Sequence, residues 1–262
     1  MSIHPPHWIR PDWPAPSRVQ AIMTRRHRGV SGQAWSSLNL GGHVGDSPDH
    51  VQTNRTQLAV WMGRRPVFLN QVHGVVSVRL TPSSPDGQIA DAAWASDGQV
   101  ACAILVADCL PVLLCDAAGQ WVAGAHAGWR GLAGVQGRGV LECLLSDLQC
   151  AGHNVSNVLA WLGPCIGAQA FEVGPEVKFA FDDGSPAVQS MFQARTRNKF
   201  MADLVGLARL RLKHLGVTRL FGNDGTTTWC TASQPHIFFS HRRDSRTLGQ
   251  TGRMAACIWL DV

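Results

Sequence analysis

The stretch Ala101–Cys115, ACAILVADCLPVLLC, is an apolar run that indicates the kind of fold this chain adopts. Apolar residues follow one another without alternation in Ala101–Val106, which is typical of a strand buried on both faces. Proline cannot donate a hydrogen bond to a central ladder, so we expect the run to break at ADCLP into two strands or one bent strand. Asp108 and Pro111 also make the run too short for a membrane span. The run therefore predicts an α/β protein in which helices flank two sheets rich in parallel strands.

Further strands and helices alternate along the chain, without internal repeats, long linkers or a shift in composition. Hydrophobic patterns predict strands at Val19–Thr24, Val67–Val72, Val75–Leu80, Trp121–His126, Asn157–Leu162, Val217–Phe221, His236–His241 and Met254–Leu260. They predict helices at Ser47–Met62, Leu132–Gln149, Pro175–Asp182 and Met201–Leu215, with loops at Ser36–Asp46 and Pro82–Gly98. We expect a single domain over residues 1–262 that begins with an irregular, proline-containing segment, 1–18.

The composition excludes several classes of protein. Of the 262 residues, 45% are hydrophobic and 16% are charged, and the mean hydropathy is −0.02, which excludes a disordered chain. The net charge is +5, but the arginines form only short clusters and no basic tract, so we expect no nucleic-acid partner. The first residues lack the apolar segment of a signal peptide. We therefore expect a cytoplasmic monomer that has no membrane partner.

The chain has eight cysteines and no tyrosine. The cysteines lie in apolar runs and form no C-x-x-C pair, so we expect reduced thiols rather than disulfides or a zinc ribbon. The absence of tyrosine leaves His, Cys, Asp, Glu and Lys as the side chains available for acid–base chemistry.

Three residues beside turns form a candidate metal site. They are His73 in NQVHG, Cys109 in ADCLP and His126 in AHAGWRG. Two imidazoles and a thiolate suit Zn²⁺, and three protein ligands leave the fourth position open, as in catalytic zinc sites. Their spacing matches no local finger motif, so each could equally be a core or surface residue. Asp108 would point to the opposite face of a strand from Cys109, and we expect it to have a structural role.

A second candidate is an anion site at Arg130, which precedes the predicted helix that starts at Leu132. Its guanidinium and the backbone N–H groups around Gly131 could bind an anion, although an arginine here could equally cap or pair. The glycines of Gly131–Gly139 do not have the spacing of a dinucleotide loop, so we reject a Rossmann site. The sequence also contains no P-loop and no G-x-S-x-G nucleophile elbow.

Several motifs in order resemble one protein family over most of Ser36–Leu260. They are NQVHG, ADCLPVLL, AHAGWRG, LGPCIG followed by FEVG, and FFSHRRD with TGRMAACIWL. This set resembles the YfiH-like laccase-domain family, also called the multicopper polyphenol oxidase or purine nucleoside phosphorylase family. The resemblance implies a single four-layer α/β/β/α domain with mixed sheets and a catalytic Zn²⁺ held by His73, Cys109 and His126. The chain departs from the family pattern at His241, where a tyrosine is usual, and in the AAWAS segment after Asp91.

The activity that the resemblance implies is phosphorolysis of purine nucleosides: adenosine, inosine, guanosine or 5′-methylthioadenosine. Deamination of adenosine, with water activated by the metal, would be a second activity. The partners would be a purine nucleoside and phosphate. We expect His73, Cys109, His126 and Arg130 to be catalytic, with Arg130 forming the phosphate cradle. The expected substrate contacts are Arg55, Arg242 and Arg253 for phosphate, and Asn39 and Gln71 for the nucleoside.

Two alternatives stay open. A multicopper oxidase needs many histidines in His-x-His pairs, and this chain has 11 histidines and no such pair. Adventitious Cu²⁺ in the same site could still give weak polyphenol oxidase activity. The family is also similar in fold to cysteine hydrolases, and some members are linked to peptidoglycan precursors. This resemblance implies the alternative of an amide hydrolase acting on those precursors, with Cys109 as nucleophile and His126 as base. Dependence on a metal distinguishes these alternatives.

Overall fold

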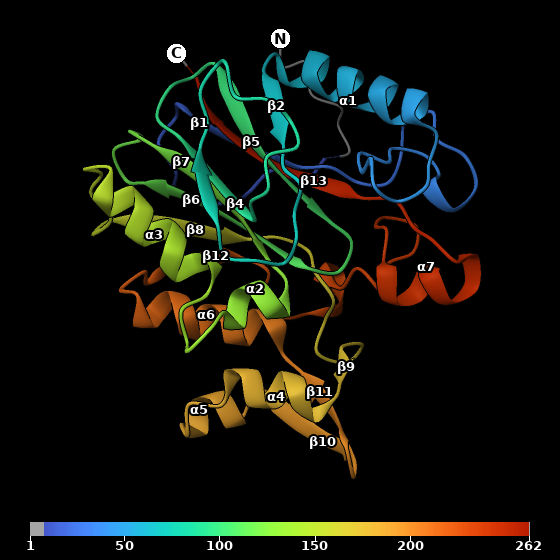
Figure 1. Cartoon of the computed structure of the whole chain (residues 1–262), viewed down its shortest axis with the longest axis vertical. Coiled ribbons are helices and arrows are strands. Elements are labelled where there is room, and N and C mark those ends of the chain that lie inside the picture. Colours follow the sequence, from blue (N-terminus) through green and yellow to red (C-terminus); the bar gives the residue numbers. More distant parts are fainter. Residues whose placement is uncertain (1–7, 262) are drawn as a thin grey trace.

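Two β-sheets lie face to face in the computed structural model, which describes residues 8–261 (Figure 1). The smaller sheet has the strand order β1-β13-β5-β2, where the strands are β1 (Val19–Met23), β2 (Arg65–Phe68), β5 (Val100–Val106) and β13 (Met254–Leu260). The larger sheet has the order β12-β8-β6-β7-β4-β3, with β3 (Ser77–Arg79), β4 (Ala92–Ala95), β6 (Leu110–Asp116), β7 (Val122–Ala127), β8 (Val158–Leu162) and β12 (Arg219–Gly222).

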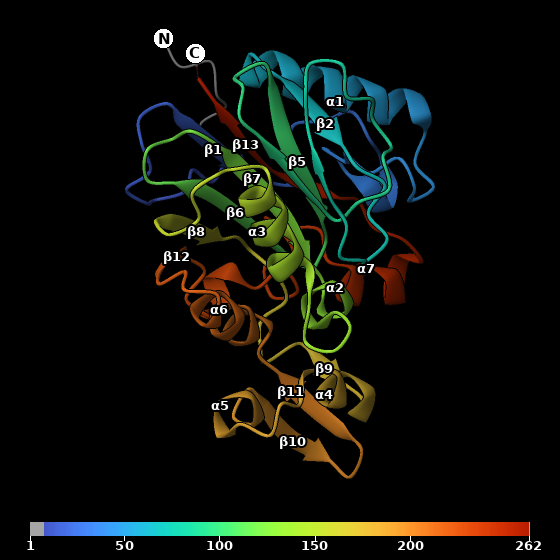
Figure 2. The same cartoon turned by 60° about the vertical axis from the view of Figure 1, so that its left-hand side comes forward.

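Helices cover the outer faces of both sheets (Figures 1 and 2). Helix α1 (Pro48–Met62) packs on the smaller sheet, and α3 (Val140–Cys150) and α6 (Leu204–His214) pack on the larger one. Separate apolar cores lie under α1, between the two sheets, and under α3 and α6. Three cores separate four layers, so the predicted α/β/β/α sandwich with mixed sheets is confirmed.

The run Ala101–Cys115 links the two sheets. Its first half forms β5 of the smaller sheet and its second half forms β6 of the larger sheet, and every residue of both strands is buried. The chain does break between them, at 107–109, where Asp108 adopts a φ of +91°. The expected cause was wrong, because Pro111 lies inside β6, opposite His126 of β7. This crossover places Cys109 at an edge where the two sheets meet.

The expectation of parallel-rich sheets was wrong. Strand β5 pairs antiparallel with β13, and β6 pairs antiparallel with both of its neighbours. In the two main sheets, parallel pairing joins only β2 to β5, β3 to β4 and β12 to β8 among the described residues. A strand between two covered faces is apolar throughout whichever way its neighbours run, so its sequence does not reveal their direction.

Four predicted elements differ from the structure. The strand expected at His236–His241 is wrong: Phe238 and Phe239 are buried in an irregular segment that follows a turn, and helix α7 (His241–Leu248) begins at its end. The long helix expected at Leu132–Gln149 is divided into α2 (Trp129–Ala133) and α3 by a turn in which Gly134 and Gly137 have positive φ. The loop expected at Pro82–Gly98 contains β4, and the first residues of the helix expected at Met201–Leu215 belong to β11.

A small sheet with two helices forms a projection at the lower end of the molecule in Figures 1 and 2. It consists of β9 (Glu172–Val173), α4 (Pro175–Phe181), α5 (Pro186–Gln189), β10 (Phe192–Thr196) and β11 (Lys199–Ala202), with the strand order β10-β11-β9. The sequence predicted only the α4 helix here. Its strands are short, and most side chains of β10 are exposed, so they give little hydrophobic pattern.

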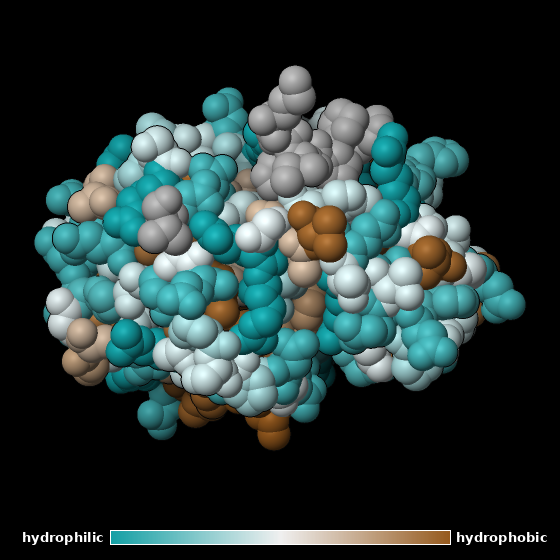
Figure 3. Space-filling model, turned by 90° about the horizontal axis from the view of Figure 1, so that it is seen from above, coloured by the Kyte–Doolittle hydropathy of each residue, from teal (hydrophilic) through white to brown (hydrophobic). Residues whose placement is uncertain are grey.

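The remaining segments add little regular structure. Short 3₁₀ turns lie at Gln33–Trp35 and Thr227–Trp229. Of the expected irregular segment 1–18, residues 1–7 lie outside the described residues, and Ile9 forms an isolated bridge with Met23. Seen from the end that carries α1, the surface outside the grey residues is mainly hydrophilic, with apolar residues in separate spots (Figure 3). Among residues 8–261, no helix has the length and apolar character needed to cross a membrane.

Candidate metal centre

The three predicted metal ligands come together although they are far apart in sequence. His73 follows β2 in a turn, Cys109 lies immediately before β6, and His126 is near the end of β7. Their ligand atoms all lie within 4.8 Å of one another, and Cys109 Sγ is 3.7 Å from His73 Nε2. The pairing of β6 with β7 sets Leu110 opposite Ala127, which brings Cys109 beside the end of β7. The crossover between the sheets therefore assembles the cluster.

A buried carboxylate, that of Asp91, lies behind the cluster. It accepts hydrogen bonds from the backbone N–H groups of Val72, His73 and Gly74 at 3.1, 2.9 and 2.7 Å. One of its oxygens is 2.8 Å from Nδ1 of His126. Burial acts to raise the pKa of Asp91, but the hydrogen bonds from His126 and the amides hold it below its usual value. The carboxylate is therefore ionised and accepts a hydrogen bond from Nδ1–H of His126, so Nε2 is the ring nitrogen that can act as a ligand.

The cluster also favours a thiolate. Burial acts to raise the pKa of Cys109, but the charge and hydrogen bonds of His126 and His73 lower it to about 6. Burial acts to lower the pKa of His126, but the Cys109 thiolate and the Asp91 carboxylate raise it to about 9. A thiolate is the form of cysteine that binds metals and acts as a nucleophile.

Asp108 has a structural role, as its position next to Cys109 suggested. Its carboxylate accepts hydrogen bonds from the Thr231 hydroxyl at 2.5 Å and from the backbone N–H of Arg242 at 2.6 Å. Its backbone carbonyl accepts one from the N–H of Ile166. Asp108 thus joins the turn before β6 to the first turn of α7, beside the cluster.

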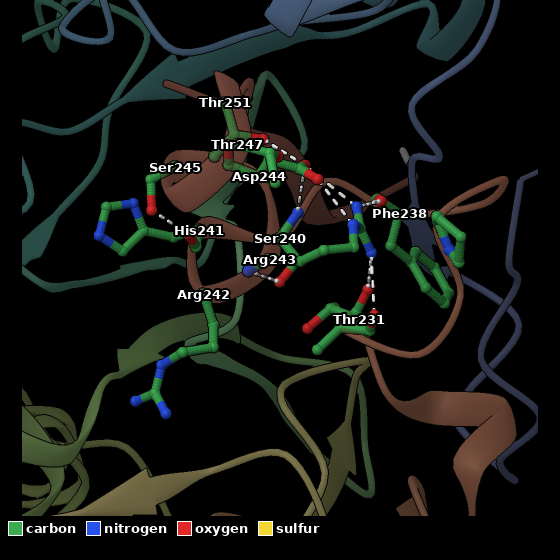
Figure 4. A network of polar contacts seen from close by, with 12 residues as sticks. Thr231, Phe238, Ser240, His241, Arg242, Arg243, Asp244, Ser245, Thr247 and Thr251 are labelled. Carbon is green, nitrogen blue, oxygen red and sulfur yellow. Dashed lines mark hydrogen bonds and ion pairs between the residues drawn. The ribbon is translucent and has the colours of Figure 1, made fainter. Parts of the chain in front are cut away.

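The start of α7 is held by a second network, shown in Figure 4. The guanidinium of Arg243 donates to the Asp244 carboxylate and to the backbone carbonyls of Thr231 and Phe238. Asp244 also accepts a hydrogen bond from Thr251. The Arg242 side chain points away from this network (Figure 4). Arg243 therefore fixes the helix, whereas Arg242 is directed elsewhere.

The cluster opens into a cavity of about 360 Å³. Four further predicted site residues line this cavity, namely Gln71, Arg130, Arg242 and Arg253. The other two, Asn39 and Arg55, lie outside its lining. A larger hollow of about 740 Å³ between α4 and α6 contains none of the predicted site residues.

The side chains outside the cavity lining have structural partners. Asn39 is buried, and its amide bonds to Gly41, Asp46 and the backbone N–H of Arg253, so it organises the glycine-rich loop. Arg55 donates to the Leu40 carbonyl. Their predicted contacts with substrate stay predictions.

The four predicted residues that line the cavity differ in how many hydrogen bonds their side chains already form within the protein. The Gln71 amide exchanges two hydrogen bonds of 2.8 Å with the backbone of Leu105, as a neighbouring strand would. Arg242 donates to the carbonyls of Ala170 and Glu172, and Arg253 donates to carbonyls in its own segment. Arg130 is exposed and its guanidinium stacks on the Trp129 ring at 4.4 Å, and this side chain makes no hydrogen bond or ion pair with the described part of the chain. Arg130 is thus the cavity arginine most available to a ligand.

Sequence reasoning missed several residues of the site. His43, Trp129, Phe171 and His241 line the cavity, and Asp91 lies behind the metal ligands. His43 follows two glycines, which was a usable signal for a loop near a ligand. Burial and the nearby Arg253 and Arg55 charges lower the pKa of His43. The cavity lining is therefore rich in nitrogen bases and cations, and its single carboxylate, Asp108, is already engaged.

The residues present fit a metal ion. The donor set is two imidazoles and a thiolate, which suits Zn²⁺ and also copper. A β-carbon on Gly128 would lie 2.8 Å from Cδ2 of His73 and 3.0 Å from Sγ of Cys109. Any residue other than glycine at this position would therefore clash with the cluster. Within residues 8–261, no other group of three such side chains has metal-binding geometry.

Fold and site together define an α/β/β/α sandwich protein with a candidate three-ligand metal centre in a basic cavity. The chain belongs to the family described as multi-copper polyphenol oxidoreductase laccase, whose model matches residues 20–261. This confirms the family resemblance found in the sequence.

Individual proteins similar to this chain are named for a function other than the one in the family description. A purine nucleoside phosphorylase of Pseudomonas aeruginosa is 47% identical over 254 residues, which is 97% of this chain and 98% of that protein. The purine nucleoside phosphorylase YfiH of Escherichia coli is 46% identical over 254 residues, which is 96% of this chain and 98% of that protein. Among solved structures, a Neisseria meningitidis protein has a TM-score of 0.85 at 45% identity, with 98% of this chain and 100% of that chain covered. YlmD of Geobacillus stearothermophilus has a TM-score of 0.87 at 29% identity, covering 98% and 97%.

Proposed function

We propose that this protein is a zinc-dependent purine nucleoside phosphorylase that acts in the cytoplasm on adenosine, inosine, guanosine and 5′-methylthioadenosine. The observation that carries the proposal is the His73–Cys109–His126 cluster, which opens into a cavity lined by Arg130, an arginine without an ion-pair partner among residues 8–261. The names of the relatives at 46–47% identity support the same reaction.

In the proposed reaction, an oxygen of phosphate forms a bond to C1′ of the ribose while the bond from C1′ to the purine nitrogen breaks. The electron pair of that bond passes to the purine, which takes up a proton and leaves as the free base. The other product is ribose 1-phosphate, or 5-methylthioribose 1-phosphate when the substrate is 5′-methylthioadenosine. Catalysis of such a step depends on holding the phosphate in line with the breaking bond and on stabilising the departing base.

The residues of the cavity supply these functions. His73, the Cys109 thiolate and Nε2 of His126 would hold the zinc ion, which when bound supplies a Lewis acid. Arg130 would bind phosphate through its fork of N–H groups, because its guanidinium has no hydrogen-bond or ion-pair partner within residues 8–261. The rings of Trp129 and Phe171 provide aromatic surface for the purine.

We further propose deamination of adenosine to inosine as a second activity of the same cavity. In that reaction water attacks C6 of the purine and ammonia leaves, and no phosphate is consumed. It would need the same ring-binding surfaces but not Arg130. The two activities can therefore be separated by the dependence of each product on phosphate.

Copper chemistry is the alternative that the family description raises. Multicopper oxidases transfer electrons between a His₂Cys copper and a separate cluster of three coppers. The described residues contain one candidate metal group, and the sequence contains no His-x-His pair. A copper ion in the His73–Cys109–His126 cluster would therefore give at most weak oxidase activity.

A second candidate function rests on the lowered pKa of Cys109 beside His126, which is also the arrangement of a cysteine hydrolase. In that case Cys109 would be the nucleophile toward an amide, as in peptidoglycan precursors, and no metal would be needed. Stoichiometric alkylation that abolishes activity of metal-free protein would favour this function.

The test is to incubate zinc-loaded protein with adenosine or inosine, with and without phosphate, and to separate the products by chromatography. We expect free purine base and ribose 1-phosphate only when phosphate is present, and inosine from adenosine in both buffers. The Cys109→Ser protein is the control for contaminating enzymes. Lack of turnover of either nucleoside in both buffers would contradict the proposal and direct attention to amide substrates.

A further inference from the structure

We propose that Asp91 is a positioning residue that sets two of the three ligands of the metal centre, His73 through its backbone and His126 through its ring. The inference rests on the proposed metal site but not on the identity of the substrate. Asp91 lies just before β4 and is completely buried.

On the His73 side, the carboxylate holds a strained turn. His73 has a φ of +60°, a left-handed conformation that residues other than glycine rarely adopt. Three consecutive N–H groups, those of Val72, His73 and Gly74, converge on the two oxygens of Asp91. This nest of amides fixes the backbone of the turn, and with it the direction in which the His73 ring leaves the chain.

On the His126 side, Asp91 acts on the ring and on the backbone. Nδ1 of His126 lies 2.8 Å from the carboxylate, and the backbone N–H of His126 donates to the Asp91 carbonyl at 2.7 Å. A carboxylate on one ring nitrogen fixes the proton there, so the other nitrogen is presented as a base, and it raises the basicity of that nitrogen.

The buried negative charge of Asp91 has one ion-pair partner within the described chain, namely His126. A buried carboxylate without a partner is costly, so the Asp91–His126 pair and the amide nest depend on one another. Asp91 therefore couples the positions of His73 and His126, which lie 53 residues apart in sequence.

The test compares Asp91→Asn with Asp116→Asn. Asp116 is a matched control because it is also buried and its carboxylate also accepts three backbone N–H groups, those of Ala118, Gln120 and Trp121. It lies at the end of β6 remote from Cys109. Zinc affinity is measured by competition with a chromophoric chelator, and unfolding of the metal-free proteins is followed by circular dichroism.

We expect Asp91→Asn to lower zinc affinity by about 10- to 100-fold, because an amide can donate to Nδ1 and move the ring proton to Nε2. We expect Asp116→Asn to lower thermal stability without changing zinc affinity. Wild-type zinc affinity in Asp91→Asn, or an equal loss in both variants, would overturn the proposal.

A second measurement needs no substitution of Asp91, and it decides the matter if that variant does not fold. Nitrogen-15 NMR of histidine-labelled wild-type protein reports the tautomer of His126, with His126→Gln used to assign its signal. We expect a proton on Nδ1 and none on Nε2 in the zinc-loaded protein. A proton on Nε2 would overturn the proposal. Because neither readout uses a nucleoside, an inactive protein would disprove the proposed function and leave the positioning role to be judged separately.

Discussion

At the scale of single residues, the thiol of Cys109 gives a pH-dependent prediction. Its pKa is lowered from 9.0 to about 6 by His126 and His73, so the thiolate is retained as the pH falls and is protonated only below about 6. In metal-free protein, we expect alkylation of Cys109 by iodoacetamide to accelerate between about pH 5 and about pH 7 and then to level off. Mass spectrometry of the Cys109 peptide measures the rate. A rate that continues to rise through about pH 8.5, as for an ordinary thiol, would contradict the prediction.

Arg130 gives a second prediction at this scale. A guanidinium that binds phosphate contributes about 1.5–3 kcal/mol, so Arg130→Ala should raise the KM for phosphate about 10- to 150-fold. Zinc content and the midpoint of thermal unfolding should not change, because the exposed guanidinium stacks on the Trp129 ring and has no hydrogen bond or ion pair with the described residues.

The matched control for Arg130 is Arg138→Ala, which removes an exposed arginine outside the cavity lining. Steady-state kinetics with phosphate as the varied substrate distinguishes the two variants. A phosphate KM that is unchanged in Arg130→Ala, or raised equally in Arg138→Ala, would show that Arg130 does not bind phosphate.

The three candidate metal ligands could be predicted before the structure was known, but the residues behind them could not. His73, Cys109 and His126 each lie beside a turn and carry ligand atoms, which made them a candidate set, and the family resemblance selected them from among the other His and Cys residues. Asp91 could not be selected, because its importance depends on three amides and a ring that the fold brings to it. The sequence also could not show that the Gln71 amide forms hydrogen bonds with the backbone of Leu105. The predicted contact of Gln71 with the nucleoside stays a prediction.

At the scale of elements, we expect a steric clash when Gly128, at the junction of β7 and α2, is replaced by a larger residue. Gly128 has an ordinary φ of −65°, so alanine is acceptable to its backbone, but the added β-carbon would overlap His73 and Cys109. Overpacking of this kind costs about 1–3 kcal/mol, and we expect Gly128→Ala to weaken zinc binding by about 5- to 150-fold.

The control for Gly128 is Gly32→Ala, since an added β-carbon there meets no atom within 4 Å and the φ is −106°. Titration of both metal-free variants with zinc measures the effect. Equal zinc affinity for Gly128→Ala and the unsubstituted protein would mean that the cluster has more space than the structure shows.

Elements with a clear pattern were predictable, and elements fixed by distant contacts were not. Helix α1 and strand β13 closely follow the expected ranges, because each combines a hydrophobic pattern with a turn or proline at its start. Helix α7 was missed because the apolar residues before it resemble a strand. They are buried in an irregular segment that is held by Arg243, Asp244 and Asp108, and these contacts span up to 134 positions of the chain.

At the scale of the whole molecule, the two sheets pack closely at Gly124 of β7 and Ile104 of β5. A β-carbon on Gly124 would lie 2.8 Å from Cγ1 of Ile104. We expect Gly124→Ala to lower the free energy of unfolding by about 1–3 kcal/mol and Ile104→Ala to lower it by about 2–5 kcal/mol. Because the second change makes room for the first, the double variant should lose less than the sum of the single losses. Urea denaturation measures all three values, and strict additivity would contradict this packing.

The central claim is that the crossover between the sheets builds a metal centre that supports phosphorolysis. The most direct measurement titrates metal-free protein with zinc while following phosphate-dependent release of hypoxanthine from inosine. We expect the rate to rise linearly and to level off at a single zinc ion per chain, and Cys109→Ser to show no such rise. A full rate in metal-free protein that a chelator does not reduce would contradict the claim.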